Sequence, residues 1–241
     1  MLSQTQINAY IRDTEQLTGL AQSKVSTLVT QIAAYPDRAE DMLNDLLYEA
    51  IRGSSDAASA LAAEMYDELR MQSGVRSGYT AIAPGLNEEA VRQSIYSTLA
   101  EWEESGSDLG FMFQRLLDVT DRRVFGDAND TIRYNVLRDP AKPRYARVLG
   151  SDEACAFCTM LASRGFVYRS EESANHRHTN CKCTVWPSWG FDPMIGSPPI
   201  EGYDPQALYD TWRDAQKVAG APSYGKDSYG WEVTKELKAH A

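Results

Sequence analysis

The residues best suited to chemistry lie in one short stretch of the chain. All four cysteines fall between positions 155 and 183, and the first 154 residues contain none. Cys155 and Cys158 form a C-x-x-C pair, and His178, Cys181 and Cys183 form an H-x-x-C-x-C run after it. Zinc prefers four nitrogen or sulfur ligands in a tetrahedron, and two short spacings of this kind supply them. These five residues are therefore candidate ligands of one zinc ion.

Three kinds of chemistry remain open for this cluster. A structural zinc comes first, because in a reducing cytosol a C-x-x-C with a second cluster binds metal more often than it forms disulfides. Disulfides become the better interpretation if the mature protein leaves the reducing cell. A catalytic thiol with a histidine partner is the third, although no nucleophile elbow or family-specific cysteine signature is present. His176 is a weaker additional ligand. The zinc ligands expected are Cys155, Cys158, His178 and one of Cys181 or Cys183.

Other catalytic motifs are missing from the sequence. It contains no GxxxxGK[ST], no GxGxxG after a strand, no HExxH and no GxSxG. Of the three histidines, His240 lies in the tail, and adjacent acids such as Glu103 and Glu104 are typical of a solvated surface. The sequence therefore favours a protein that is not an enzyme.

The elements that must position the cluster are mostly helical. Apolar residues recur at steps of three or four over 3–34 and again over 37–72, which predicts an antiparallel helical hairpin over 1–72. Turn residues over 73–86 predict a loop. Further helices are expected over 87–102, 108–125 and 127–138.

The helical periodicity of the sequence ends at Pro140 and Pro143, and shorter elements follow. A strand over 144–149, a short helix over 154–162, short extended pieces over 166–168 and 184–186, and a helix starting at Asp204 are expected. The predicted fold is mainly α, with a helical hairpin and bundle followed by a small α+β, loop-rich, zinc-binding C-terminal module. The predicted domains are 1–140, 141–203 and 204–241.

Composition and charge exclude several classes of protein. The chain has 241 residues, 43% of them hydrophobic and 24% charged, as in an ordinary soluble domain. No run approaches the ~20 apolar residues of a membrane span, and the N-terminus has no signal-peptide pattern. We therefore expect synthesis in a cytosol and no membrane partner.

The charge is distributed unevenly. The chain carries a net charge of −10, and residues 1–72 hold 11 acidic against 5 basic side chains. Residues 122–147 instead hold 7 basic and 3 acidic side chains, a net charge of +4. We expect this basic segment to face an acidic partner, unless its own acids neutralise it.

The stretch RYARVLGSDEACAFCTMLASRGFVYRSEESANHRHTNCKCTVWPSW, residues 144–189, resembles the Mu F-like minor head proteins of tailed bacteriophages, most closely those of actinobacteriophages. The resemblance covers roughly residues 130–190. It rests on the C-x-x-C pair, on Leu161–Tyr168, and on the closing H-x-x-C-x-C run.

The resemblance implies a structural role. Such a protein would be a minor capsid component of low copy inside the virion head near the portal, present in the host cytoplasm during assembly. It would aid head assembly and DNA packaging or ejection, with the portal protein and the major capsid or scaffold protein as partners. Packaged DNA is a further candidate partner through residues 122–147. The alternative is an enzyme, either a head-maturation protease or a zinc-dependent hydrolase or nuclease.

Overall fold

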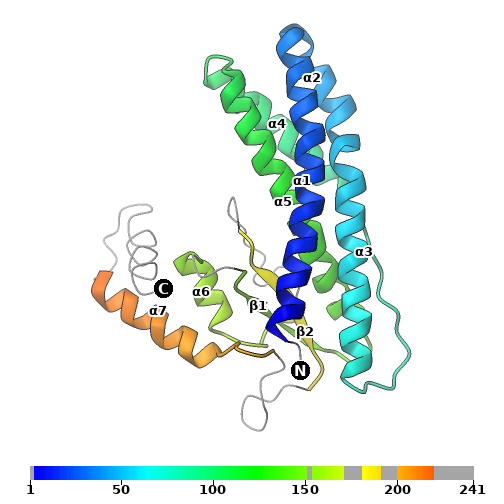
Figure 1. Ribbon diagram of the computed structural model, residues 1–241, viewed down its shortest axis with the longest axis vertical. Helices are drawn as coiled ribbons and strands as arrows, with labels where there is room; N and C mark the ends of the chain where they lie inside the picture. The colour runs from blue at the N-terminus through cyan, green and yellow to red at the C-terminus, as the bar shows by residue number, and fades with distance from the viewer. Residues whose placement is uncertain (1–2, 151–153, 171–180, 191–199, 220–241) are drawn as a thin grey trace.

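The computed structural model describes residues 3–150, 154–170, 181–190 and 200–219. Within them the chain is mainly helical with one small antiparallel sheet, which confirms the predicted fold class. The long helices run along one axis, and the sheet and the last two helices gather at one end (Figure 1). In chain order the elements are α1 (Gln4–Ala34), a 3-10 turn (Pro36–Arg38), α2 (Ala39–Met42), a π-helical turn (Leu43–Leu47), α3 (Tyr48–Gln72), α4 (Glu88–Glu104), α5 (Leu109–Arg138), β1 (Arg144–Val148), α6 (Ala156–Ala162), β2 (Thr184–Ser188) and α7 (Pro205–Ala219).

The first long helices form the predicted antiparallel hairpin. α1 begins with a capping box, in which Ser3 Oγ accepts a hydrogen bond from the Gln6 amide and the Gln6 side chain accepts one from the Ser3 amide. It ends at Ala34, with Tyr35 as its C-cap, because Pro36 disfavours helical backbone at the preceding residue. The chain returns through the two short turns and α2 into α3, which packs against α1.

Helix α5 differs from the sequence-based prediction, because it is one continuous helix. The sequence predicted two helices, over 108–125 and 127–138, with Gly126 between them. Asp108 caps the start of α5 by accepting a hydrogen bond of 2.8 Å from the Gly110 amide, and the helix then runs unbroken to Arg138. A glycine inside a helix costs about 1 kcal/mol. The packing of α5 against both α1 and α3 outweighs that cost.

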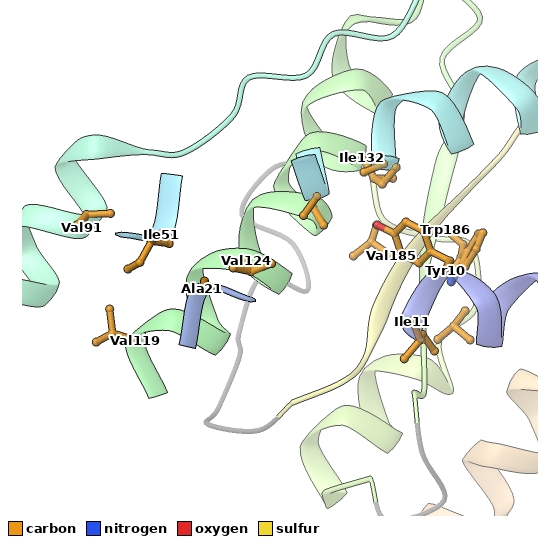
Figure 2. Packing of buried hydrophobic residues seen from close by; sticks show 14 of the residues in the cluster. Tyr10, Ile11, Ala21, Ile51, Val91, Val119, Val124, Ile132, Val185 and Trp186 are labelled. Carbon is orange, nitrogen blue, oxygen red and sulfur yellow. The ribbon is translucent and has the colours of Figure 1, made fainter. Parts of the chain in front are cut away.

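The sheet rests on the helices through one hydrophobic cluster. β1 and β2 pair antiparallel, from Arg144 opposite Ser188 to Val148 opposite Thr184. The rings of Tyr10 from α1 and Trp186 from β2 meet edge to face with centroids 5.4 Å apart (Figure 2). The same cluster continues into α5, so residues on both sides of position 140 share a core. The division into three domains stays a prediction.

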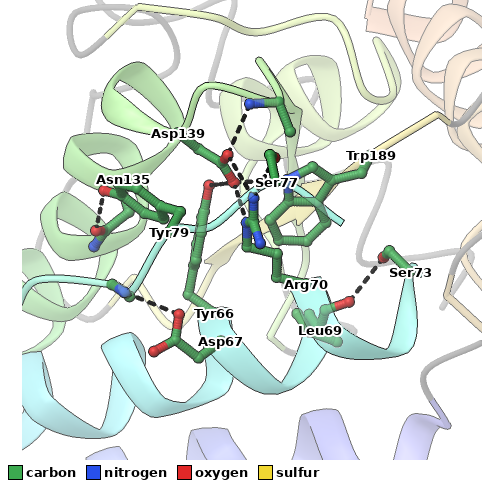
Figure 3. Close-up of polar contacts among 12 residues, drawn as sticks. Tyr66, Asp67, Leu69, Arg70, Ser73, Ser77, Tyr79, Asn135, Asp139 and Trp189 are labelled. Atoms are coloured by element: carbon green, nitrogen blue, oxygen red, sulfur yellow. Dashed lines mark hydrogen bonds and ion pairs between the residues drawn. The ribbon is translucent and has the colours of Figure 1, made fainter. Parts of the chain in front are cut away.

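A buried carboxylate ties the end of α5 to its neighbours (Figure 3). Asp139 forms an ion pair with Arg70 of α3, with 2.8 Å between Nε and Oδ2, and both side chains are buried. Tyr66 and Trp189 donate to the same oxygen at 3.1 and 2.8 Å, and the Ala141 amide donates to Oδ1 at 2.9 Å. Asp139 therefore fixes the turn that leads into β1 and the segment that follows β2.

Helix α7 begins where the sequence predicts a helix. Asp204 Oδ1 accepts hydrogen bonds from the amides of Gln206 and Ala207 at 2.9 and 3.0 Å, which caps α7. α7 packs against α6. Among the described residues, no helix combines the length and the apolar character that a membrane span requires.

Candidate metal centre

Three of the four cysteines meet in the interior. The sulfur atoms of Cys158, Cys181 and Cys183 all lie within 4.8 Å of one another. The Sγ atoms of Cys158 and Cys181 are 3.5 Å apart. The three residues are only 1%, 2% and 4% exposed. Thiolates at such spacing are the ligands of structural zinc sites, so this thiol cluster can bind a metal ion.

The fourth cysteine lies at the edge of this group. Cys155 is the N-cap of α6, and its sulfur accepts a hydrogen bond of 3.4 Å from the amide of Cys158. It is partly buried and packs against the other three cysteines. His178, which was predicted as a ligand, and the weaker candidate His176 lie outside the described residues.

The segment of Cys181 and Cys183 is anchored on α5. The Asn129 side chain donates a hydrogen bond of 3.1 Å to the carbonyl of Cys183 and accepts one of 2.9 Å from the amide of Val185. The first group directly precedes β2 and the second lies within it, so one buried amide sets the position of the start of this strand. The two cysteines before β2 are thereby held against the bundle.

Lys182, between the two cysteines, reaches the helices instead of the thiol cluster. Its Nζ is 2.9 Å from Asp121 Oδ1 and 3.8 Å from Glu15 Oε1, and it lies 4.5 Å from the centre of the Phe125 ring. Lys182 therefore ties the segment of the two cysteines to α1 and α5.

A glycine allows the chain to close around the cluster. At Gly150, just after β1, a Cβ atom would lie 2.0 Å from the carbonyl oxygen of Lys182. Any other residue would therefore force the two backbone segments apart. This close approach keeps the end of β1 beside the Cys181–Cys183 segment.

A buried arginine completes the cluster. Arg147 of β1 has 0% exposed surface, and its Nη2 lies 3.2 Å from Cys181 Sγ and 4.0 Å from Cys158 Sγ. The hydrogen bonds from Cys158 and Cys183, together with the Arg147 charge, hold the pKa of Cys181 far below its usual range. The site therefore favours an anionic sulfur beside the guanidinium.

The pKa values of Cys158 and Cys183 are shifted upward, opposite to that of Cys181. Hydrogen bonds with Cys155, Cys181 and Cys183 raise the pKa of Cys158. The hydrogen bond with Cys158 lowers the pKa of Cys183, but the hydrogen bond with Cys181 and burial outweigh it and raise this pKa to about 11. Three thiolates this close repel one another, and a divalent cation among them removes that repulsion.

The structure corrects one expectation about the basic segment. Arg133 and Arg147 are buried, at 2% and 0% exposure, so residues 122–147 do not form one basic surface. From the sequence alone, Arg147 is not assigned to the thiol cluster. A signal was present, because the residue lies inside the strand predicted over 144–149, whose neighbours are apolar.

The fold and the site define a mainly helical protein whose C-terminal part closes around a buried thiol cluster. A sequence model described as VG15 protein matches residues 1–215. The chain therefore belongs to the VG15 protein family, a viral gene-product family of phages. Comparison with curated proteins and with solved structures gave no match.

Proposed function

We propose that the chain is a minor capsid protein of a tailed phage, located inside the head near the portal. The observation that carries the proposal is the family match over residues 1–215 together with the Mu F-like pattern of residues 144–189. The portal protein and the major capsid or scaffold protein would be its partners. It would aid head assembly and DNA packaging or ejection, after synthesis in the host cytoplasm.

The role proposed is structural rather than catalytic. A catalytic zinc has three protein ligands and an open position for water, whereas a structural zinc site is closed. The thiols of Cys158, Cys181 and Cys183 are almost completely buried, which supports the closed type.

We also propose that the cluster holds one structural zinc ion. Cys158, Cys181 and Cys183 would supply three ligands, and Cys155 or His178 the fourth. The proposal rests on three buried sulfurs within 4.8 Å of one another. Zinc would join α6 to the segment just before β2 and so help to fold the C-terminal module.

The capsid proposal is tested on purified virions. Quantitative mass spectrometry should find the chain in particles at low copy relative to the major capsid protein, and cross-linking in intact heads should join it to the portal. Detection only in the soluble lysate, with none in purified particles, would refute the proposal.

The zinc proposal is tested separately on the isolated chain. Elemental analysis of protein made without added metal should find close to one zinc per chain. A chain with no metal and no titratable thiols would carry disulfides instead.

Contact with packaged DNA is proposed through the exposed part of the basic segment. Arg138, Lys142 and Arg144 are exposed, around the turn between α5 and β1. The three acids of the segment have other contacts: Asp127 accepts from Ser55, Asp130 pairs with Arg133, and Asp139 pairs with Arg70. This supports a basic surface that attracts phosphate.

A further inference from the structure

The buried charge of Arg147 bears on the protonation of the neighbouring sulfur atoms. A guanidinium is charged in any folded protein, and a buried charge is costly unless a group of opposite charge compensates it. The contacts of its Nη2 at 3.2 and 4.0 Å are to sulfur atoms. A neutral thiol is a weak acceptor, so these contacts are favourable when the sulfur is a thiolate.

The charge of a zinc–thiolate centre matches this arrangement. A divalent cation with three thiolates and a neutral histidine carries one net negative charge, and with four thiolates it carries two. Arg147 cancels the first charge and halves the second. Because the cysteines and Arg147 are buried, an uncompensated anion at this site would cost much free energy.

The position of Arg147 in β1 suits this task. It lies opposite Val185 of β2. Because Val185 is two positions beyond Cys183, this register brings the guanidinium to the thiol cluster. Arg144, at the start of the same strand, is exposed. One strand therefore carries one arginine in solvent and one in the cluster.

We propose that Arg147 is the positioning residue of the metal centre, whose guanidinium donates an N–H···S hydrogen bond to Cys181 and balances the charge of the metal–thiolate group. This inference rests on the proposed zinc site. Groups that hydrogen-bond to metal ligands commonly change metal affinity by 10- to 100-fold, roughly. The sulfur ligands themselves favour a thiophilic divalent ion over a hard, oxygen-preferring one such as Mg²⁺.

The test measures zinc affinity by competition with a chromophoric chelator. We expect Arg147→Gln to bind zinc about 10- to 100-fold more weakly than the wild type. Arg147→Lys keeps the charge and should recover part of the loss. Arg144→Gln, the matched control on the same strand, should bind like the wild type. The sulfur-to-cobalt charge-transfer bands of the Co²⁺-loaded chains should shift in Arg147→Gln and not in Arg144→Gln.

The outcomes separate the two proposals. Equal zinc affinity in Arg147→Gln and the wild type would overturn the role of Arg147 and leave the zinc site intact. A wild type that binds no zinc would overturn the zinc site and, with it, this inference. A loss in Arg147→Gln without any recovery in Arg147→Lys would reduce Arg147 to a packing role.

A measurement on the wild type covers the case in which Arg147→Gln does not fold. In the zinc-loaded chain, the Arg147 guanidinium protons should exchange with water far more slowly than those of exposed Arg144. Exchange at the rate of Arg144 would contradict hydrogen bonding to buried sulfur.

Discussion

The thiol of Cys158 links two segments that are far apart in the chain, since it belongs to α6 while Cys181 and Cys183 precede β2. We expect Cys158→Ser to lose bound zinc and to unfold the C-terminal module. The helical signal of α1, α3 and α5 should remain, because their packing does not depend on the thiols. Zinc analysis, circular dichroism and limited proteolysis of the full chain check this.

The comparison variant for Cys158→Ser is Cys155→Ser, which removes the thiol at the edge of the cluster. If His178 is the fourth ligand, this variant should still bind zinc, whereas it should fail to do so if Cys155 is a ligand. Full zinc occupancy and unchanged stability in Cys158→Ser would show that the cluster does not hold a structural metal.

Asn129 is a second residue whose side chain holds one particular segment, the start of β2. Its side chain bonds the carbonyl of Cys183 and the amide of Val185. Asn129→Ala leaves two buried backbone groups without this partner, at about 1–3 kcal/mol for an unsatisfied group. We expect a lower free energy of unfolding and faster amide exchange in β2. Asn8→Ala, which removes an exposed side-chain hydrogen bond to Gln4, is the control and should change neither quantity.

At the scale of the elements, Asp139 joins α3, α5 and the end of β2. Burial raises the pKa of its carboxyl, but the hydrogen bonds from Arg70, Ala141 and Trp189 outweigh burial and lower it below its usual value. A group whose pKa is lowered in the folded state stabilises the fold above its unfolded pKa of about 3.9. That stabilisation is lost as the pH falls through the lower folded value.

Asp139→Asn should therefore destabilise the chain by about 3–5 kcal/mol at neutral pH, because it leaves the Arg70 charge buried without its partner. The acid-induced loss of stability should also be shallower than in the wild type. Denaturant unfolding at a series of pH values from about 7 down to about 2, which spans the ordinary pKa of a carboxyl group, measures both effects. Glu88→Gln, which breaks an exposed ion pair with Arg92, should leave the midpoint unchanged. Equal behaviour of the two variants would contradict the role given to Asp139.

At the scale of the whole molecule, the proposed contact with packaged DNA depends on how charge is distributed over the chain. The chain is acidic overall, at a net charge of −10, while Arg138, Lys142 and Arg144 lie together around one exposed turn. Replacing these three residues by Gln should weaken binding to duplex DNA at low salt. The slope of log affinity against log salt should fall by about 1 for each lost phosphate contact.

The control variant replaces Lys24, Arg38 and Arg52, all exposed on the acidic N-terminal hairpin, by Gln. It changes the net charge by the same amount and should leave DNA binding unaffected if the basic turn is the contact surface. Thermal stability of both variants should match the wild type. Equal loss in the two variants would mean that only total charge matters.

The sequence by itself determined most of the helical elements and the cysteines that are candidate metal ligands. Helical periodicity is a local property, so α1 and α4 begin and end close to where their apolar spacing and capping residues predict. The helix predicted over 37–72 ends as predicted, but its first part is a 3-10 turn, α2 and a π-helical turn, and α3 itself begins only at Tyr48. The C-x-x-C and C-x-C spacings are local as well, so the cysteines that gather in the interior were already candidates.

Only the tertiary structure decided which charges are buried and which segments meet. α5 is unbroken because it packs against α1 and α3, which are distant in sequence, and local propensity does not include such contacts. Asp139 is an anchor because Arg70 comes from another helix. Arg147 is part of the thiol cluster because the register of β1 on β2 takes it inside. In each case the deciding contact joins residues far apart along the chain, and their pairing energy depends on a geometry that no single stretch of sequence contains.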